Sequence, residues 1–250
     1  MKSQEILDVH PGWRDIVRFV YVPDYTVPGA FDEAIKQEKG LSYIIHTASP
    51  VTVDVEDIQK QLIDPAIKGT TSLLKSVHEH GGPQVKRFVL LSSSAAIMNS
   101  LENTSSTGDP YTEKDWNPFL EENKTSFDMT VINPDVVIGP MIQNVDVRDV
   151  SRAHILSLDS PEMSNQRVEL VNAHMTPQLV VNIIRKNFPD LKSRVPEGNP
   201  SQIVPEGVQM ARYNNEKSHR VFGKDWNYRD LETSVVDTVK DILRLEREWQ

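Results

Sequence analysis

The chain has 250 residues and a formal net charge of −9, from 27 basic and 36 acidic side chains. This acidic balance argues against nucleic acids and anionic membrane surfaces as partners, because both are bound by basic surfaces. The absence of cysteine excludes disulfides, cysteine-ligated metals and thiol catalysis. No apolar run approaches the ~20 residues that span a bilayer, and the N-terminus lacks the apolar core of a signal peptide. We therefore expect a soluble, cytoplasmic protein.

Strands and helices alternate in the first half of the predicted structure. We predict a helix over 1–9, a strand over 16–22, a helix over 31–39, a strand over 41–47, a long helix over 58–80, and strands over 85–91 and 127–132. Short, nearly continuous apolar strands that alternate with helices are typical of a parallel sheet buried on both faces. The sequence therefore predicts an α/β fold with a truncated, Rossmann-like parallel sheet.

The second half predicts a smaller lobe. Its elements are a helix over 145–160, a strand over 167–172, a helix over 177–187, a proline-rich loop over 196–205 and a C-terminal helix over 231–249. Helical spacing predicts two buried faces, one formed by Val147, Val150, Ala153, Ile155 and Leu158, the other by Val235, Val236, Val239, Ile242 and Leu243. We expect a nucleotide-binding domain over 1–140 and a substrate lobe with the C-terminal helix over 141–250.

Three predicted strands end in small or turn-forming residues. The three ends are Ala48-Ser49-Pro50, Ser92-Ser93-Ser94 and Asn133-Pro134. In open α/β sheets the ligand crevice lies at the carboxyl ends of the strands, and small side chains there let a ligand approach the backbone. Small residues also commonly end strands without any ligand, so the pattern leaves both interpretations open.

Several common site motifs are absent from the sequence. It contains no G-x-G-x-x-G, G-x-x-G-x-x-G or P-loop, and only Gly81 and Gly82 fall within three residues of each other. Closely spaced glycines normally let backbone N–H groups at a helix start reach a pyrophosphate. G-x-S-x-G and H-E-x-x-H are also missing. His78 and His80 fit a solvated helix end, so we predict no metal site.

A series of short motifs nevertheless follows a known order. These are HPGW at 10–13, PGAFDEA at 28–34, the turn at 48–50, DPAIKGT at 64–70, the serines at 92–94, WNP at 116–118, VINP at 131–134 and VDVRDV at 145–150. Together they resemble the dihydroflavonol reductase branch of the extended short-chain dehydrogenase/reductases. That branch includes cinnamoyl-CoA reductases and fungal methylglyoxal and ketone reductases.

The resemblance implies an NADP-binding Rossmann sheet and reduction of a small ketone or aldehyde by hydride transfer, in a setting such as fungal secondary metabolism. It implies that Ser94 is the catalytic serine that hydrogen-bonds the substrate carbonyl. The implied cofactor contacts are Asp24 at the adenine, Ala48, Ser49 and Pro50 under the ribose, and Ser92, Ser93, Pro134 and Val136 beside the nicotinamide. Asp135 stands where the family has a second proline.

The sequence also departs from the family pattern. The first strand, the glycine turn and the residues that choose NADP over NAD have no counterpart here, so we expect exposed strand edges and either low stability or a partner. The family's Tyr-x-x-x-Lys helix, whose acidified tyrosine protonates the forming alkoxide, has no room after WNP. Tyr213 and Lys217 have this spacing by coincidence, and Tyr111 and Lys114 lie three apart in a polar loop.

Two functional hypotheses remain within this family, and an α/β binding protein unrelated to it is a third. The chain is a reductase by descent whose sequence is incomplete, or it is a non-catalytic binding or scaffold relative.

Overall fold

The computed structural model describes residues 2–50, 55–96, 123–135, 137, 143–204, 206–207 and 214–248. The chain divides into two compact units. The first contains Met1–Ser42 and Ala48–Val85, and the second contains Tyr43–Thr47 and Lys86–Gln250. The expected functional division at residue 140 concerns cofactor and substrate binding, and it stays a prediction.

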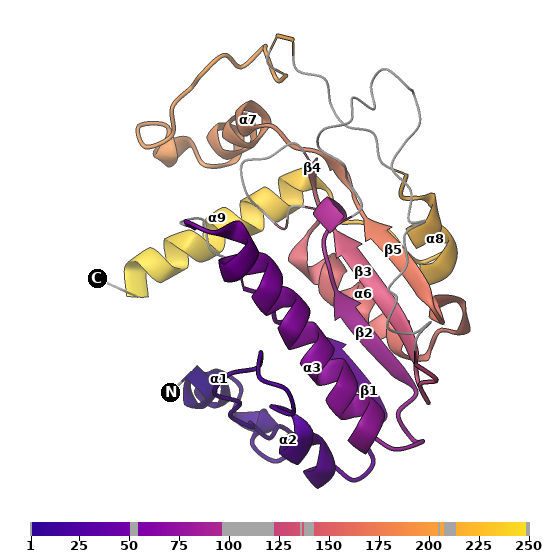
Figure 1. The fold of residues 1–250 in the computed structure, drawn as a ribbon. Helices are drawn as coiled ribbons and strands as arrows, with labels where there is room; N and C mark the ends of the chain where they lie inside the picture. Colours follow the sequence, from indigo (N-terminus) through magenta and orange to yellow (C-terminus); the bar gives the residue numbers. More distant parts are fainter. Residues whose placement is uncertain are drawn as a thin grey trace. The chain divides into compact units, whose positions relative to one another are not determined.

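The second unit is built on a parallel sheet (Figure 1). Its strands are β1 (Tyr43–His46), β2 (Arg87–Leu91), β3 (Asp128–Pro134) and β5 (Gln166–Leu170), in the order β1-β2-β3-β5. Leu90 of β2 is in register with His46 on one side and Val131 on the other. The carboxyl ends of the strands therefore meet at one edge. The predicted α/β class and parallel sheet are confirmed.

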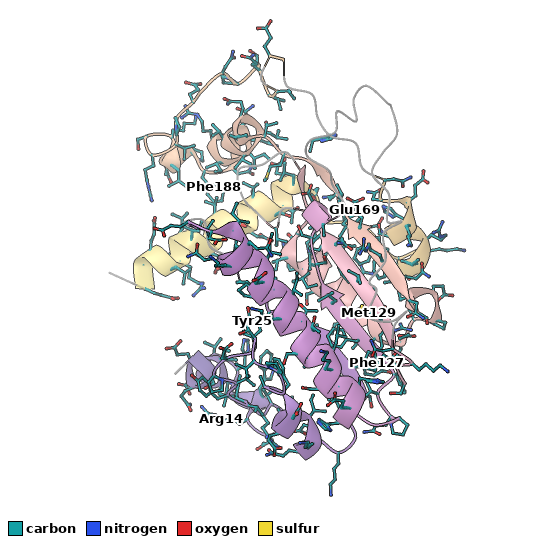
Figure 2. The ribbon with its side chains drawn as sticks, in the orientation of Figure 1. Arg14, Tyr25, Phe127, Met129, Glu169 and Phe188 are labelled. Carbon is teal, nitrogen blue, oxygen red and sulfur yellow. The ribbon has the colours of Figure 1, made fainter. Side chains whose placement is uncertain are left out.

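Apolar side chains bury the sheet on both faces, as the sequence predicts. Phe88, Val89, Met129 and Ile132 are fully buried, and Figure 2 shows Met129 within the sheet. Helix α6 (Val147–Asp159) packs against β2 and β3. The main core cluster consists of Val89, Ile132, Val145, Val150, Ala153, Met163, Val168, Leu170 and Trp226.

A second, smaller core joins two helices of the same unit. Helix α7 (Pro177–Asn187) packs on α9 (Leu231–Glu248), through Met175, Ile183, Leu231 and Val235. Helix α8 (Glu216–Phe222) lies against β5. The two-residue strands β4 (Gln143–Asn144) and β6 (Ala173–His174) pair antiparallel. They are too short to leave a periodic pattern, so the sequence did not predict them.

The predicted buried faces of α6 and α9 need correction. Val147 and Ile155 of α6 are exposed, as is Ile242 of α9. His154 and Ser157 take buried positions on α6 instead. Each places a polar atom on a carbonyl one turn earlier in the helix, at 2.8 Å for His154 and 2.6 Å for Ser157. This internal hydrogen bonding lowers the cost of burying them, so counting apolar residues alone misplaces the face.

One buried arginine ties α6 to the sheet. The Arg87 guanidinium makes two bonds to the Asp128 carboxylate, at 2.5 and 2.9 Å, and donates to the Ser160 carbonyl at 2.6 Å. It also donates to the Ser157 carbonyl. A cation is favourable at a helix C-terminus, where carbonyls lack helical partners. Arg87 therefore joins the starts of β2 and β3 to the end of α6.

The first unit is helical. It contains α1 (Lys2–Val9), α2 (Asp32–Gln37), a π-helical turn η2 (Gln59–Ile63) and α3 (Asp64–His80), which continues from that turn. On α3, Ser72 donates to the Val27 carbonyl at 2.8 Å and Ser76 to the Asp32 carboxylate at 2.6 Å. These bonds hold α2 and the loop before it against α3.

The strand predicted over 16–22 is wrong, because this segment is irregular in the structure. A strand needs a neighbour that supplies backbone partners, and residues 16–22 have no paired strand among the described residues. Their side chains are correspondingly exposed, with Tyr21 at 83%. Arg18 instead binds Gln37 and Glu38, each at 2.8 Å, at the end of α2.

Short 3-10 turns occupy several connections: η1 (Pro11–Trp13), η3 (Ser94–Ala96), η4 (Pro161–Met163) and η5 (Pro189–Leu191). The described part of the predicted loop over 196–205 contains neither helix nor strand. None of the helices in the described ranges has both the length and the apolar character that crossing a membrane requires.

Candidate functional site

The carboxyl ends of β2 and β3 bring two predicted segments together. Ser92, Ser93 and Ser94 follow β2, and Ser94 opens the η3 turn. The Ser92 N–H donates to the Ile132 carbonyl at 2.8 Å, which extends the β2–β3 pairing by one bond. The serine turn therefore lies beside the Asn-Pro-Asp end of β3.

Two side-chain hydrogen bonds join these segments. Asn133 donates its Nδ2 hydrogen to the Ser93 carbonyl at 2.7 Å, and the Ser94 hydroxyl donates to Oδ1 of Asp135 at 3.2 Å. Side chains two positions apart on an extended chain point to the same side, so Asn133 and Asp135 both reach the serine turn. We call Ser92, Ser93, Ser94, Asn133 and Asp135 the strand-end site.

The backbone at Asp135 fixes the position of its carboxylate. The Asp135 N–H donates to the carbonyl of Leu170, at the end of β5, at 3.1 Å. A proline here, as in the family pattern, has no N–H and could not make this bond. The replacement of proline by Asp135 thus adds both a backbone bond and a carboxylate.

The strand-end site is rich in acceptors and combines two buried side chains with the half-buried Ser92 and Asp135 and the exposed Ser93. Ser94 is 4% exposed and Asn133 is 0% exposed. Asn133 Oδ1 has no hydrogen-bond partner within the described ranges, and a buried acceptor without a partner is costly. An ionised carboxylate can only accept, so the hydroxyl proton of Ser94 points to Asp135 and the remaining lone pairs of Ser94 are acceptors.

Among the described residues of this neighbourhood, none supplies the usual proton donor of a carbonyl reductase. That role needs a tyrosine with a lowered pKa beside an ammonium. Burial instead raises the pKa of Tyr228 to about 12, and its hydroxyl donates to Ser218 at 2.7 Å. Tyr111, Lys114 and Tyr213 lie outside the described residues, whereas Lys217 lies on α8.

Of the remaining predicted cofactor residues, Pro134 lies at the end of β3 between Asn133 and Asp135, and the other described ones lie elsewhere in the chain. Asp24, in the first unit, accepts from the Thr26 N–H at 2.9 Å and the Thr26 hydroxyl at 2.6 Å. The Thr26 hydroxyl, more than its N–H, lowers the pKa of Asp24. Ala48 and Ser49 are exposed and Pro50 is half-buried after β1, while Pro134 is buried. Val136 lies outside the described residues. The cofactor roles of all these residues stay predictions.

The described residues show no site for a metal ion, since no three His, Asp or Glu side chains among them gather in a suitable group. His46, at the carboxyl end of β1, is buried and meets the Phe88 ring edge-on. Burial lowers the pKa of His46, so this side chain is neutral at pH 7.

The residues present fit a dinucleotide only in part. Small side chains at the carboxyl ends of β2 and β3 suit the approach of a flat ring. The sequence offers no closely spaced glycines for a pyrophosphate. The Ser94 hydroxyl donates its hydrogen bond to Asp135. The chain thus offers a place for the ring and lacks the usual glycine cradle for the phosphates.

The sequence drew attention to Ser94 but missed the two side chains that contact its turn. Asn133 and Asp135 are spaced by two residues at the end of a predicted strand, which places both on one side. That spacing is the signal that could have found them.

Comparison with known proteins gives the family. Residues 5–121 match the model of the NAD dependent epimerase/dehydratase family. The putative NADPH-dependent methylglyoxal reductase GRP2 of Candida albicans is 31% identical over 282 residues, covering 89% of this chain and 82% of the relative. Ketoreductase azaE of Aspergillus niger is 32% identical, also over 282 residues, covering 90% and 82%. Each alignment is longer than the 250-residue chain, so the relatives contain internal segments with no counterpart here.

A solved structure agrees with these relatives. The crystal structure of yeast methylglyoxal/isovaleraldehyde reductase Gre2 complexed with NADPH superposes with a TM-score of 0.85. It is 26% identical and the match covers 98% of this chain and 89% of that one. The chain belongs to the NAD dependent epimerase/dehydratase family of extended short-chain dehydrogenase/reductases.

Proposed function

We propose that the chain is an NADP-dependent reductase of small ketones or aldehydes. Its methylglyoxal reductase and ketoreductase relatives support this activity and this class of substrate. The observation that carries the proposal is the buried Ser94 hydroxyl at the carboxyl end of β2. In a parallel sheet this is the edge at which ligands bind.

Ser94 would bind the substrate carbonyl. Its bond to Asp135, at 3.2 Å, is longer than the 2.7–2.8 Å typical of O–H···O bonds. A modest rotation of the hydroxyl would therefore redirect its hydrogen bond from the Asp135 carboxylate to a carbonyl oxygen. Ser92, Ser93 and Pro134 would lie beside the cofactor ring, which supplies a hydride when bound.

Other residues would hold the remainder of the cofactor. Asp24 would contact the adenine, and Ala48, Ser49 and Pro50 would support the ribose. Val136 would line the ring together with Pro134.

A second candidate function is a non-catalytic binding or scaffold protein of the same family. Two observations favour it: the absence of closely spaced glycines and the donation of the Ser94 proton to Asp135. In this case the fold persists and hydride transfer does not. A cytoplasmic location is part of either proposal.

The first experiment is a calorimetric titration of NADPH into the purified protein. The reductase proposal expects a Kd below ~100 μM, and no binding by a folded sample favours the non-catalytic relative. Carbonyl reduction would then be screened with Ser94→Ala and, as a matched serine in the first unit, Ser76→Ala. We expect Ser94→Ala to lower kcat/KM by about 10²-fold and Ser76→Ala to change it by less than about twofold. Equal losses would refute the role of Ser94.

A further inference from the structure

We propose that the strand-end site binds a small cation that donates N–H hydrogen bonds, namely a protonated primary amine or imine. This goes beyond the reduction of a neutral carbonyl. It requires neither a bound nucleotide nor turnover, so it can be tested separately from the proposed function.

The first argument is the direction of the Ser94 hydrogen bond. A serine hydroxyl has one proton, and Ser94 donates it in a hydrogen bond to Oδ1 of Asp135. What Ser94 offers a ligand in this state is its lone pairs. A neutral carbonyl oxygen carries only lone pairs of its own, so it gains no hydrogen bond from Ser94 unless the hydroxyl rotates. An N–H donor gains one without any change in the protein.

The second argument is the buried amide of Asn133. Its nitrogen is fixed on the Ser93 carbonyl at 2.7 Å, which sets the orientation of the whole amide. Its oxygen is buried and has no partner in the part of the chain that the structure describes. Such an acceptor is satisfied by a ligand donor, and a carbonyl oxygen cannot satisfy it.

The third argument is charge. Asp135 brings a carboxylate to a partly buried position beside the nearly closed Ser94, where electrostatic interactions are screened less than in water. A cation is attracted there, whereas the negative charge that develops on a carbonyl oxygen during reduction is repelled. Charge-assisted hydrogen bonds to a carboxylate are also stronger than neutral ones.

These three groups together match one ligand class. Ser94 Oγ, Asn133 Oδ1 and the Asp135 carboxylate are all acceptors on the same strand ends. A primary ammonium group has three N–H donors and one positive charge, and a protonated imine has the same charge with fewer donors. Neutral alcohols, ketones and aldehydes lack the positive charge. An alcohol has only one hydrogen-bond donor, and ketones and aldehydes have none.

The test uses the whole protein and three probes of similar shape: benzylammonium, benzyl alcohol and benzaldehyde. Binding is followed by NMR through the side-chain amide signals of Asn133, which report on this site without any activity. The main variant is Asp135→Asn, which removes the charge and keeps an oxygen acceptor and the backbone N–H. The matched control is Asp32→Asn, because Asp32 also accepts from a serine, Ser76, at 2.6 Å in the first unit.

We expect benzylammonium to shift the Asn133 signals and to bind at least about tenfold more tightly than either neutral probe. Asp135→Asn should weaken benzylammonium about tenfold, and Asp32→Asn should change it by less than about twofold. Equal binding of the three probes to the unmodified protein would overturn the proposal, even if Asp135→Asn failed to fold. So would unchanged benzylammonium affinity in Asp135→Asn.

The outcomes also separate this proposal from the proposed function. NADPH binding with no preference for the ammonium probe supports the reductase and rejects the cation site. Binding of the ammonium probe without binding of NADPH supports the cation site and rejects the reductase.

Discussion

Gly69 lies in the middle of α3. The sign of the change in stability when alanine replaces it shows whether helix propensity or packing against a neighbouring ring dominates at this position. Alanine is favoured over glycine in a helix interior by about 1 kcal/mol. A Cβ at Gly69 would, however, overlap Cδ2 and Cε2 of the Tyr25 ring, well inside the 3.0 Å limit of real Cβ contacts. Both residues belong to the first unit, and Figure 2 labels Tyr25.

The overlap involves the body of the ring, so the ring has to move as a whole. Forcing extra carbon into a packed contact costs about 1–3 kcal/mol. We therefore expect Gly69→Ala to destabilise the protein by about 1 kcal/mol net, after the helix preference offsets part of the clash. In a Tyr25→Ala background the clash is gone, and the same substitution should stabilise by about 1 kcal/mol.

The assay is a double-mutant cycle from urea unfolding of the four proteins, with far-UV circular dichroism as the signal. The two substitutions should show a coupling of about 2 kcal/mol, because they act on one contact. If Gly69→Ala stabilises the protein equally with and without the Tyr25 ring, the packing argument is wrong and α3 follows helix propensity alone.

Two further predictions concern buried charges in the second unit. Arg87→Met should lower the free energy of unfolding by about 3–5 kcal/mol, because Asp128 keeps a charge without its cation. The control Arg244→Met removes an exposed arginine and should cost under about 1 kcal/mol. Similar losses in the two variants would contradict the importance of the Arg87–Asp128 pair. Asp146 is 1% exposed and accepts hydrogen bonds from Arg148 and from Ser234, the latter at 2.6 Å. The hydrogen bond from Arg148 holds the pKa of Asp146 well below its usual range. Its contribution to stability is therefore present above the unfolded pKa of about 3.9 and is lost as the pH falls below that value. Acid unfolding curves should show Asp146→Asn less stable than the parent by about 3 kcal/mol at pH 7, with the gap closing below about pH 4; a gap that widens in acid would refute the assignment.

Much of the fold was predictable, because it depends on local patterns. The β2 and β3 strands are short apolar runs that fit a doubly covered sheet, and helix α7 occupies the range 177–187 that the sequence predicts. The segment 16–22 shows where local patterns fail. It has the composition of a strand, yet strand formation depends on a neighbouring backbone that composition does not report.

The candidate site was predictable in position and less so in chemistry. Small residues after two strands indicated the carboxyl edge of the sheet as the candidate site, and the structure places Ser94 at that edge. The partner of Ser94 depends on a contact between residues 41 positions apart, which no local pattern specifies. The direction of that hydrogen bond, and with it the excess of acceptors, became visible only in the structure.

The backbone bond from Asp135 to Leu170 limits which residues position 135 can accept. A proline at position 135, as in the family pattern, would leave the Leu170 carbonyl without this donor, at the end of a strand whose last residue is fully buried. A lost bond of this kind costs about 1–3 kcal/mol, a large part of the stability of a typical domain. An Asp135→Pro substitution should therefore be tolerated only together with a compensating change elsewhere in the chain.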